Sequence, residues 1–385
     1  MHVWSDLFFA LMVPLLPFIK DELDLSFTEV GLLRSTFVGA TAVLQVPAGY
    51  LAESVGEFWM LIAGNAWVSL GLLGMAAAPG FVVLVLVSGI AGLGGGTQHP
   101  LASSMVSRAY DDRGRSTAVG TVNFAGDMGK LVAPLAAGLF AVALGWRGTM
   151  VTVGVAGLVF MLASTMTRRA VGLPAPAEVA PSPDRAPPNA ASPTSISGFV
   201  ILSGLGILDS AARAGALVFL PFVMASKDMG PTRISAMLFL LFVGGAVGKL
   251  VVGWLGDRFD TVSLIWVTKG LTALMLGLAM ATPALAMAPL MFLTGVGLNG
   301  TSSVLYATVA EFVPGARRAR FYGFYYTTNE IGTIIAPLAY GVVADLFGLN
   351  AAMVVLGIAT AMILPSSLTL RGRLGPRKVT EPGRA

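Results

Sequence analysis

The chain alternates long apolar runs with short polar connections, and this alternation constrains its fold more than any other feature. A helix needs about 20 apolar residues to cross the hydrocarbon core of a bilayer. Only 11% of the 385 residues are charged, against about 25% in a soluble domain. We therefore expect an all-α membrane protein with 12 transmembrane helices, in runs near residues 2–19, 28–52, 58–79, 81–108, 116–144, 148–167, 197–225, 232–254, 261–281, 284–312, 318–346 and 348–370.

A proline-rich stretch divides these runs into two sets of six. Residues 170–196 contain seven prolines, a composition typical of a disordered linker. We expect an N-terminal six-helix bundle over 1–169, a cytoplasmic linker over 170–196, a C-terminal six-helix bundle over 197–371 and a cytoplasmic tail over 372–385.

The basic residues predict the orientation of the chain. Of the 24 lysines and arginines, 15 fall in the loops and tail on one side and four in the loops on the other. Because cytoplasmic loops carry the excess of basic residues, we expect a multi-pass protein of the cytoplasmic (inner) membrane with both termini inside. The same distribution explains the net charge of +4 without a nucleic-acid partner.

Several other classes of site are excluded or unsupported. The chain has no Cys and only two His, which excludes disulfides and thiolate chemistry and argues against a zinc site. No Gly-Lys-Ser/Thr follows the run Gly92–Gly96, so ATP-driven transport by this chain is unsupported. We find no catalytic constellation and expect no enzyme activity, no cofactor and no metal.

The two halves repeat one another in sequence. Leu16-Pro17-Phe18 recurs as Leu220-Pro221-Phe222, a shift of 204 residues. Ala133-Pro134-Leu135-Ala136 recurs as Ala336-Pro337-Leu338-Ala339, a shift of 203. Two parallel six-helix repeats are the architecture of many transporters that work by alternating access.

Two loops carry a motif that links the chain to a known family. The connection after the second run reads Gly49-Tyr50-Leu51-Ala52-Glu53, and its repeat reads Gly253-Trp254-Leu255-Gly256-Asp257-Arg258. These residues resemble the cytoplasmic gate motif of the major facilitator superfamily, nearly intact in the second loop and weakened in the first. The resemblance implies gate roles for Gly49, Glu53, Gly253, Asp257 and Arg258, in which a carboxylate at a helix end faces a neighbouring helix.

Further residues resemble one branch of that family. His2 with Asp6, the segment Gly94-Gly95-Gly96-Thr97-Gln98-His99-Pro100 and the start of the fifth helix are similar to the fosmidomycin-resistance branch. The resemblance implies export of small anionic or amphipathic compounds in exchange for protons. It also implies that helices 3, 6, 9 and 12 face lipid and that the other eight line the cavity.

Charged residues within the expected spans are the main functional candidates, because each costs at least about 2.5–3.5 kcal/mol at the bilayer centre. Among these residues only Lys269 lies on a helix that, according to the resemblance, faces lipid. We expect Lys269 either to snorkel or to form a structural pair. The full set is Asp6, Arg34, Asp127, Lys130, Asp209, Arg213, Lys249, Lys269 and Glu330.

The fifth helix places three polar residues on one face. Asn123, Asp127 and Lys130 follow helical spacing, and Asp127 can pair with Lys130 at i, i+3. The pair is either structural or functional, with Lys130 binding an anion and Asp127 exchanging a proton. Glu330 is the repeat mate of Asp127, but Thr333 replaces Lys130, so Glu330 is either a proton carrier or a neutral, hydrogen-bonded acid.

The remaining candidates also carry two interpretations. Asp209 and Arg213 at i, i+4 form either a self-neutralising pair or part of a site, His2 is either solvated or paired with Asp6, and Arg34 either attracts anions or pairs with an acid. Our candidates for substrate binding are Lys130, Arg213, Arg34, His99, Asn123, Tyr326 and Asn329. Those for proton coupling are Asp127, Glu330, Asp6 and Asp209.

These observations predict a secondary active transporter of a small, anionic or amphipathic solute, with proton-coupled efflux as the leading hypothesis. The alternatives are proton symport or facilitated uptake of an organic anion, and a membrane sensor or scaffold that does not transport. The expected partners are a small-molecule substrate, protons and the lipid bilayer, and we expect a monomer.

Overall fold

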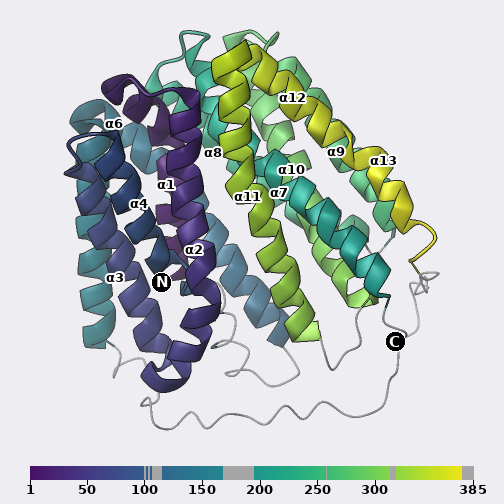
Figure 1. Cartoon of the computed structure of the whole chain (residues 1–385), viewed down its shortest axis with the longest axis horizontal. Helices are drawn as coiled ribbons and strands as arrows, with labels where there is room; N and C mark the ends of the chain where they lie inside the picture. Colours follow the sequence, from purple (N-terminus) through teal and green to yellow (C-terminus); the bar gives the residue numbers. More distant parts are fainter. Residues whose placement is uncertain are drawn as a thin grey trace. The chain divides into compact units, whose positions relative to one another are not determined.

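The computed structural model describes residues 1–98, 101–102, 105, 115–167, 195–256, 258–312 and 318–374. In these ranges every regular element is helical (Figure 1). The first half contains α1 (His2–Leu23), α2 (Phe27–Val55), α3 (Glu57–Ala76), α4 (Phe81–Gly95) and α6 (Arg115–Thr167). The second contains α7 (Ile196–Ala225), α8 (Pro231–Gly256), α9 (Thr261–Ala279), α10 (Met287–Phe312), α11 (Arg318–Phe347), α12 (Leu349–Ala361) and α13 (Ile363–Ser367), with short 3-10 turns at Ala284–Ala286 and Leu368–Leu370.

The helices account for all 12 expected spans. The 53-residue α6 is two helices joined at Gly145, whose φ of 70° is not helical. The segment Leu349–Leu370 forms the last apolar span from α12, α13 and a 3-10 turn. Nine helices among the described residues are long and apolar enough to cross a membrane, and α4 is a shorter apolar helix. The expected all-α, 12-helix architecture is therefore confirmed.

Local sequence signals explain where helices begin and end. Ser26 caps α2 by accepting a hydrogen bond from the Glu29 N–H at 3.1 Å, and Glu29 accepts one from the Ser26 N–H at 2.8 Å, which satisfies two of the free N–H groups there. Asp260 caps α9, and hydrogen bonding from Ser263 holds the pKa of its carboxyl below the usual value. Gly145 and Gly348, 203 residues apart, both have positive φ and separate consecutive spans.

The chain divides into two compact units, each described here by itself. The first comprises the described residues of Met1–Pro183 and Met224–Phe239, and the second those of Asp184–Val223 and Leu240–Ala385. In the first, α1 packs on α6, α4 on α2 and α3, and α3 on α6. In the second, α9 packs on α10 and α12, and α11 packs on α12. Residues 170–194 of the expected linker and 375–385 of the expected tail lie outside the described residues.

The internal repeat is also visible in how the helices pack. A methyl group added at Gly129 of α6 would collide with the Val3 carbonyl of α1. One added at Gly332 of α11 would collide with the Ile207 carbonyl of α7. The two glycines are 203 residues apart and the two carbonyls are 204 apart, which is the register found in the sequence. Both halves therefore use a glycine to bring the same pair of helices into close contact.

Candidate functional site

An ion-pair cluster joins α1 to α6 in the first unit. The Lys130 Nζ lies 2.9 Å from Asp127 Oδ1 and 3.1 Å from Asp6 Oδ2. The expected i, i+3 contact between Asp127 and Lys130 is thus present, and Asp6 adds a second carboxylate from another helix. We call Asp6, Asp127 and Lys130 the N-terminal charge cluster.

Glycines of α6 make this cluster possible. A Cβ atom at Gly126 would overlap the His2 ring and lie 2.7 Å from Asp6 Oδ2, so only glycine lets α1 approach closely here. His2 fits against Gly126, with Nε2 at 3.8 Å from Asp6 Oδ2. Only 7% of His2 is exposed. Of the two interpretations of His2, the structure therefore agrees with pairing to Asp6 and not with solvation.

The N-terminal charge cluster contains more acid than base. With a neutral His2, two carboxylates face one ammonium group, which leaves one negative charge in excess. The Asp6 side chain is 3% exposed, whereas Lys130 is 30% exposed. Asp6 on α1 is therefore shielded by packing, whereas Lys130 on α6 is partly accessible.

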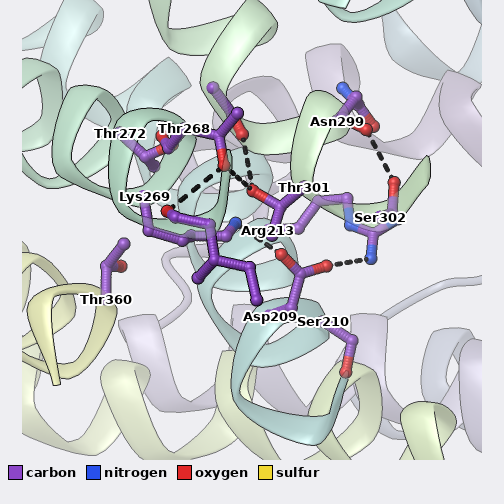
Figure 2. A network of polar contacts seen from close by, with 12 residues as sticks. Asp209, Ser210, Arg213, Thr268, Lys269, Thr272, Asn299, Thr301, Ser302 and Thr360 are labelled. Atoms are coloured by element: carbon purple, nitrogen blue, oxygen red, sulfur yellow. Dashed lines mark hydrogen bonds and ion pairs between the residues drawn. The ribbon is translucent and has the colours of Figure 1, made fainter. Parts of the chain in front are cut away.

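A second cluster lies in the other unit and contains more base than acid. Asp209 of α7 lies between two cations, with Oδ2 at 2.9 Å from an Arg213 NH2 group and Oδ1 at 2.5 Å from the Lys269 Nζ (Figure 2). These three side chains carry two positive charges and one negative charge, and an ionised Glu330, which lies within electrostatic range of Arg213, balances the remaining positive charge. We call Asp209, Arg213 and Lys269 the C-terminal charge cluster.

Lys269 has the structural pairing that was one of its two expected roles. Its side chain is fully buried and reaches from α9 to Asp209 on α7, so it does not snorkel. Hydroxyl groups surround its helix. Thr301 of α10 donates to Thr268 Oγ1 at 2.7 Å, and Thr268 donates to a carbonyl of its own helix at 2.8 Å (Figure 2). Lys269 therefore fixes one oxygen of Asp209 from a position closed to solvent, whereas the Arg213 side chain is 26% exposed.

Tyrosines of α10 and α11 lie near Arg213. Tyr326 stacks on Tyr306 with ring centroids 4.7 Å apart and an angle of 28° between the rings. Tyr325 meets Tyr306 edge-on at 5.3 Å. Arg213 lies within electrostatic range of Tyr306 and Tyr325, and the Asn329 amide lies beside both hydroxyls.

Glu330 gains a charged neighbour that its own helix does not supply. The sequence places Thr333 where its repeat mate has Lys130, so α11 provides no equivalent cation. The structure places Arg213 of α7 within electrostatic range of Glu330. This proximity depends on the packing of the second unit, which local spacing does not reveal.

The other candidates divide into those with described contacts and those without. Arg34 is 5% exposed, donates to the Phe9 carbonyl at 2.9 Å and lies 4.2 Å from the Phe9 ring centroid. Arg258 lies 3.6 Å from the Trp254 ring centroid, and the space around the Cα atoms of Gly49 and Gly253 is open. His99, Asp257 and the side chains of Asn123 and Glu53 lie outside the described residues.

Sequence reasoning selected Tyr326 for its place near Glu330 but missed Tyr306 and Tyr325, because their proximity to each other and to Arg213 depends on the packing of three helices. The repeat also contains a signal for Lys269 that sequence reasoning did not use. Its repeat mate, 204 positions earlier, is Asn65 of α3. Asn65 is buried and donates to Gln98 Oε1 at 2.8 Å. A polar residue at the same register in both halves indicates an inward-facing position.

The comparisons with known proteins agree with this fold. The sequence matches the Major Facilitator Superfamily twice, over residues 2–206 and 202–384. The chain belongs to this superfamily. It is similar to a bacterial homologue of the lysosomal transporter Spinster, with a TM-score of 0.82, 16% identity, and coverage of 97% of this chain and 95% of that one.

Curated relatives from two bacteria are also similar to the chain. The MFS-type transporter YfnC of Bacillus subtilis is 26% identical over 96% of this chain and 92% of its own length. The 3-(3-hydroxy-phenyl)propionate transporter of Escherichia coli is 27% identical over 81% and 74%, respectively. The fosmidomycin resistance protein of Escherichia coli is 23% identical over 89% and 84%. The protein is thus a multi-pass membrane transporter of the superfamily and not an enzyme, and the predicted resemblance is confirmed.

Proposed function

We propose that this transporter carries a small organic anion across the cytoplasmic membrane together with a proton, by alternating access of its two halves. In this proposal it acts as a monomer with both termini in the cytoplasm. The observation that carries the proposal is the partly exposed Arg213, which shares Asp209 with a second cation, Lys269. Charge is costly in a membrane, and when Glu330 is protonated a bound anion would balance these two cations together with Asp209.

Arg213 is the residue that we assign to the anion. It is the partly exposed cation of its cluster, while Lys269 is fully buried against Asp209. A guanidinium group can bind a carboxylate through two parallel hydrogen bonds. Asp209 then anchors the two cations, which is a different role from the proton transfer expected for it from the sequence.

The N-terminal charge cluster is our candidate for the coupled proton. Its excess carboxylate can take up a proton without leaving a net positive charge, and Lys130 lies between Asp6 and Asp127. Glu330 is a second candidate, because it shares Arg213 with the proposed anion. The charged and titratable neighbours described around Arg213 and Glu330 are Asp209 on α7, Lys269 on α9, Tyr306 on α10 and Tyr325 on α11.

Electrostatics favours symport over the proton-coupled efflux that the sequence suggested first. An anion at Arg213 competes with an ionised Glu330 for the same cation, so anion binding favours protonation of Glu330. By linkage, proton binding then favours anion binding to the same extent. Exchange of proton for substrate requires the two to oppose each other's binding. The name of the hydroxyphenylpropionate relative indicates an organic anion, which agrees with this substrate class.

Counterflow in proteoliposomes tests transport itself. Vesicles loaded with unlabelled glucuronate or benzoate are diluted into the labelled compound, and a carrier produces transient accumulation of label. We expect accumulation for at least one of the two anions, with loss of at least 90% of it in Arg213→Gln. Lys227→Gln, which removes a charge from the connection between α7 and α8, serves as the matched control.

Protein-free vesicles give the background from passive permeation. Absence of counterflow with both anions in folded wild-type protein would contradict the proposal and favour the sensor alternative. Equal counterflow in wild type and Arg213→Gln would show transport but reject Arg213 as the anion site.

A further inference from the structure

The region around Arg213 combines a cation with a stacked pair of aromatic rings. Arg213 projects from α7, Tyr306 from α10, and Tyr325 and Tyr326 from the first third of α11. The three helices thus contribute one charged group and three rings to one part of the second unit. Positive charge and aromatic surface together recognise a narrower set of ligands than positive charge does alone.

The aromatic residues differ in exposure. Tyr325 is 1% exposed and meets Tyr306 edge-on. Tyr326, which stacks on Tyr306, is 49% exposed. A planar ligand that reaches the exposed surface of Tyr326 would extend the existing aromatic stack. Offset-stacked and edge-on arrangements are the geometries that aromatic groups prefer.

Arg213 retains hydrogen-bonding capacity for a ligand. A guanidinium group has five N–H donors, and the hydrogen bond described for Arg213 uses its NH2 group and Asp209 Oδ2. Lys269 holds the other oxygen of the same carboxylate. Asp209 therefore remains paired with Lys269 when some of the Arg213 N–H groups donate to a bound anion.

We infer that the substrate is an aromatic carboxylate, with its carboxylate on Arg213 and its ring against the Tyr306–Tyr326 pair. This inference rests on the proposed organic-anion transport and narrows its substrate class. The Asn329 amide lies beside the Tyr306 and Tyr325 hydroxyls, and it supplies a polar contact for a ring substituent. A saturated ring of the same size and charge satisfies Arg213 but lacks the flat face.

Binding to purified protein in detergent tests the inference with matched ligands. Isothermal titration calorimetry compares benzoate with cyclohexanecarboxylate and 3-phenylpropionate with 3-cyclohexylpropionate, and benzyl alcohol serves as the neutral aromatic compound. In wild-type protein we expect at least one aromatic acid to bind five- to tenfold more tightly than its saturated counterpart, since stacking adds to the shared charge contact. Benzyl alcohol is expected to bind at least tenfold more weakly than that acid.

Two variants assign the effect to residues. Tyr326→Leu is expected to reduce the preference for the aromatic acid to less than twofold while the saturated acid still binds. Tyr50→Leu, which removes an exposed tyrosine of α2, is the matched control and keeps the preference. Arg213→Gln is expected to lose both acids while the protein remains folded, as shown by a cooperative thermal unfolding transition.

The outcomes separate this inference from the proposed function. Equal affinity for aromatic and saturated acids in wild-type protein overturns the aromatic assignment and leaves organic-anion transport standing. Binding of neither kind of acid to folded protein overturns the aromatic assignment, and together with absent glucuronate counterflow it overturns the transport proposal as well. An aromatic preference that persists in Tyr326→Leu rejects the proposed ring contact.

Discussion

At the scale of single residues, the charge clusters show what local spacing can predict. Asp127 with Lys130 and Asp209 with Arg213 are neighbours on one helix, so i, i+3 and i, i+4 spacing predicts both contacts. Asp6 and Lys269 reach their clusters from other helices. Their participation depends on tertiary packing, which spacing along a single helix does not encode.

The burial of Lys269 leads to a prediction about stability. Lys269→Met removes the buried counter-ion of Asp209 and should destabilise the protein by about 3 kcal/mol, near the lower end for a broken buried pair because Arg213 remains. The measurement is thermal unfolding in detergent, with Lys227→Met as the matched control.

A double variant isolates the charge effect at this position. Adding Asp209→Asn to Lys269→Met removes the uncompensated carboxylate, so more than half of the lost stability should return. If the double variant is as unstable as the sum of the single variants, the two side chains are not energetically coupled, and the counter-ion role of Lys269 is wrong.

At the scale of helices, close approach at glycine sets the position of the charges. Gly129 brings α6 against the α1 backbone one residue before Lys130, and Gly332 brings α11 against α7 two residues after Glu330. The sequence predicted the repeat, because glycines and prolines recur at fixed intervals, and the apolar runs predicted the number of spans. It did not predict which side chains use the space that the glycines leave, as the fit of His2 against Gly126 illustrates.

Alanine substitution at these glycines should separate the helices. Gly129→Ala and Gly332→Ala each place a methyl group on a backbone carbonyl and should cost about 1–3 kcal/mol, as overpacking does. Gly277→Ala adds the same methyl group to α9 at a position with open space. It should be neutral or stabilise the protein by up to about 1 kcal/mol through helix propensity.

Melting temperatures of the three variants test this prediction. Glucuronate or benzoate counterflow then shows whether transport depends on the close approach of the helices. We expect slower transport in Gly129→Ala and an unchanged rate in Gly277→Ala. Equal melting temperatures for all three variants would mean that the contacts of Gly129 and Gly332 do not set the helix separation.

At the scale of the whole molecule, the two halves share a backbone plan but pair their charges differently. The repeat register relates Gly129 to Gly332 and their contact carbonyls to each other, yet one cluster joins two carboxylates to one cation and the other joins one carboxylate to two cations. Composition and repeats were sufficient to predict the 12-helix fold, and the resemblance of the gate motif predicted the superfamily. The proposed division between a proton site and an anion site rests on contacts between helices, which the sequence did not reveal.

We therefore expect an organic anion and a proton to move together across the membrane. The direct measurement is lumenal pH in proteoliposomes containing a trapped pH dye, after benzoate or benzenesulfonate is added outside. Benzenesulfonate is included because a strong acid does not carry protons across the bilayer by itself. Protein-free vesicles, Arg213→Gln and Asp127→Asn provide the background.

We predict that at least one of these anions acidifies the lumen of wild-type vesicles at least fivefold faster than that of any background sample. Protein-dependent alkalinisation of the lumen would indicate exchange of the anion for protons and would contradict symport. No protein-dependent change with either anion, in vesicles that show counterflow, would contradict proton coupling.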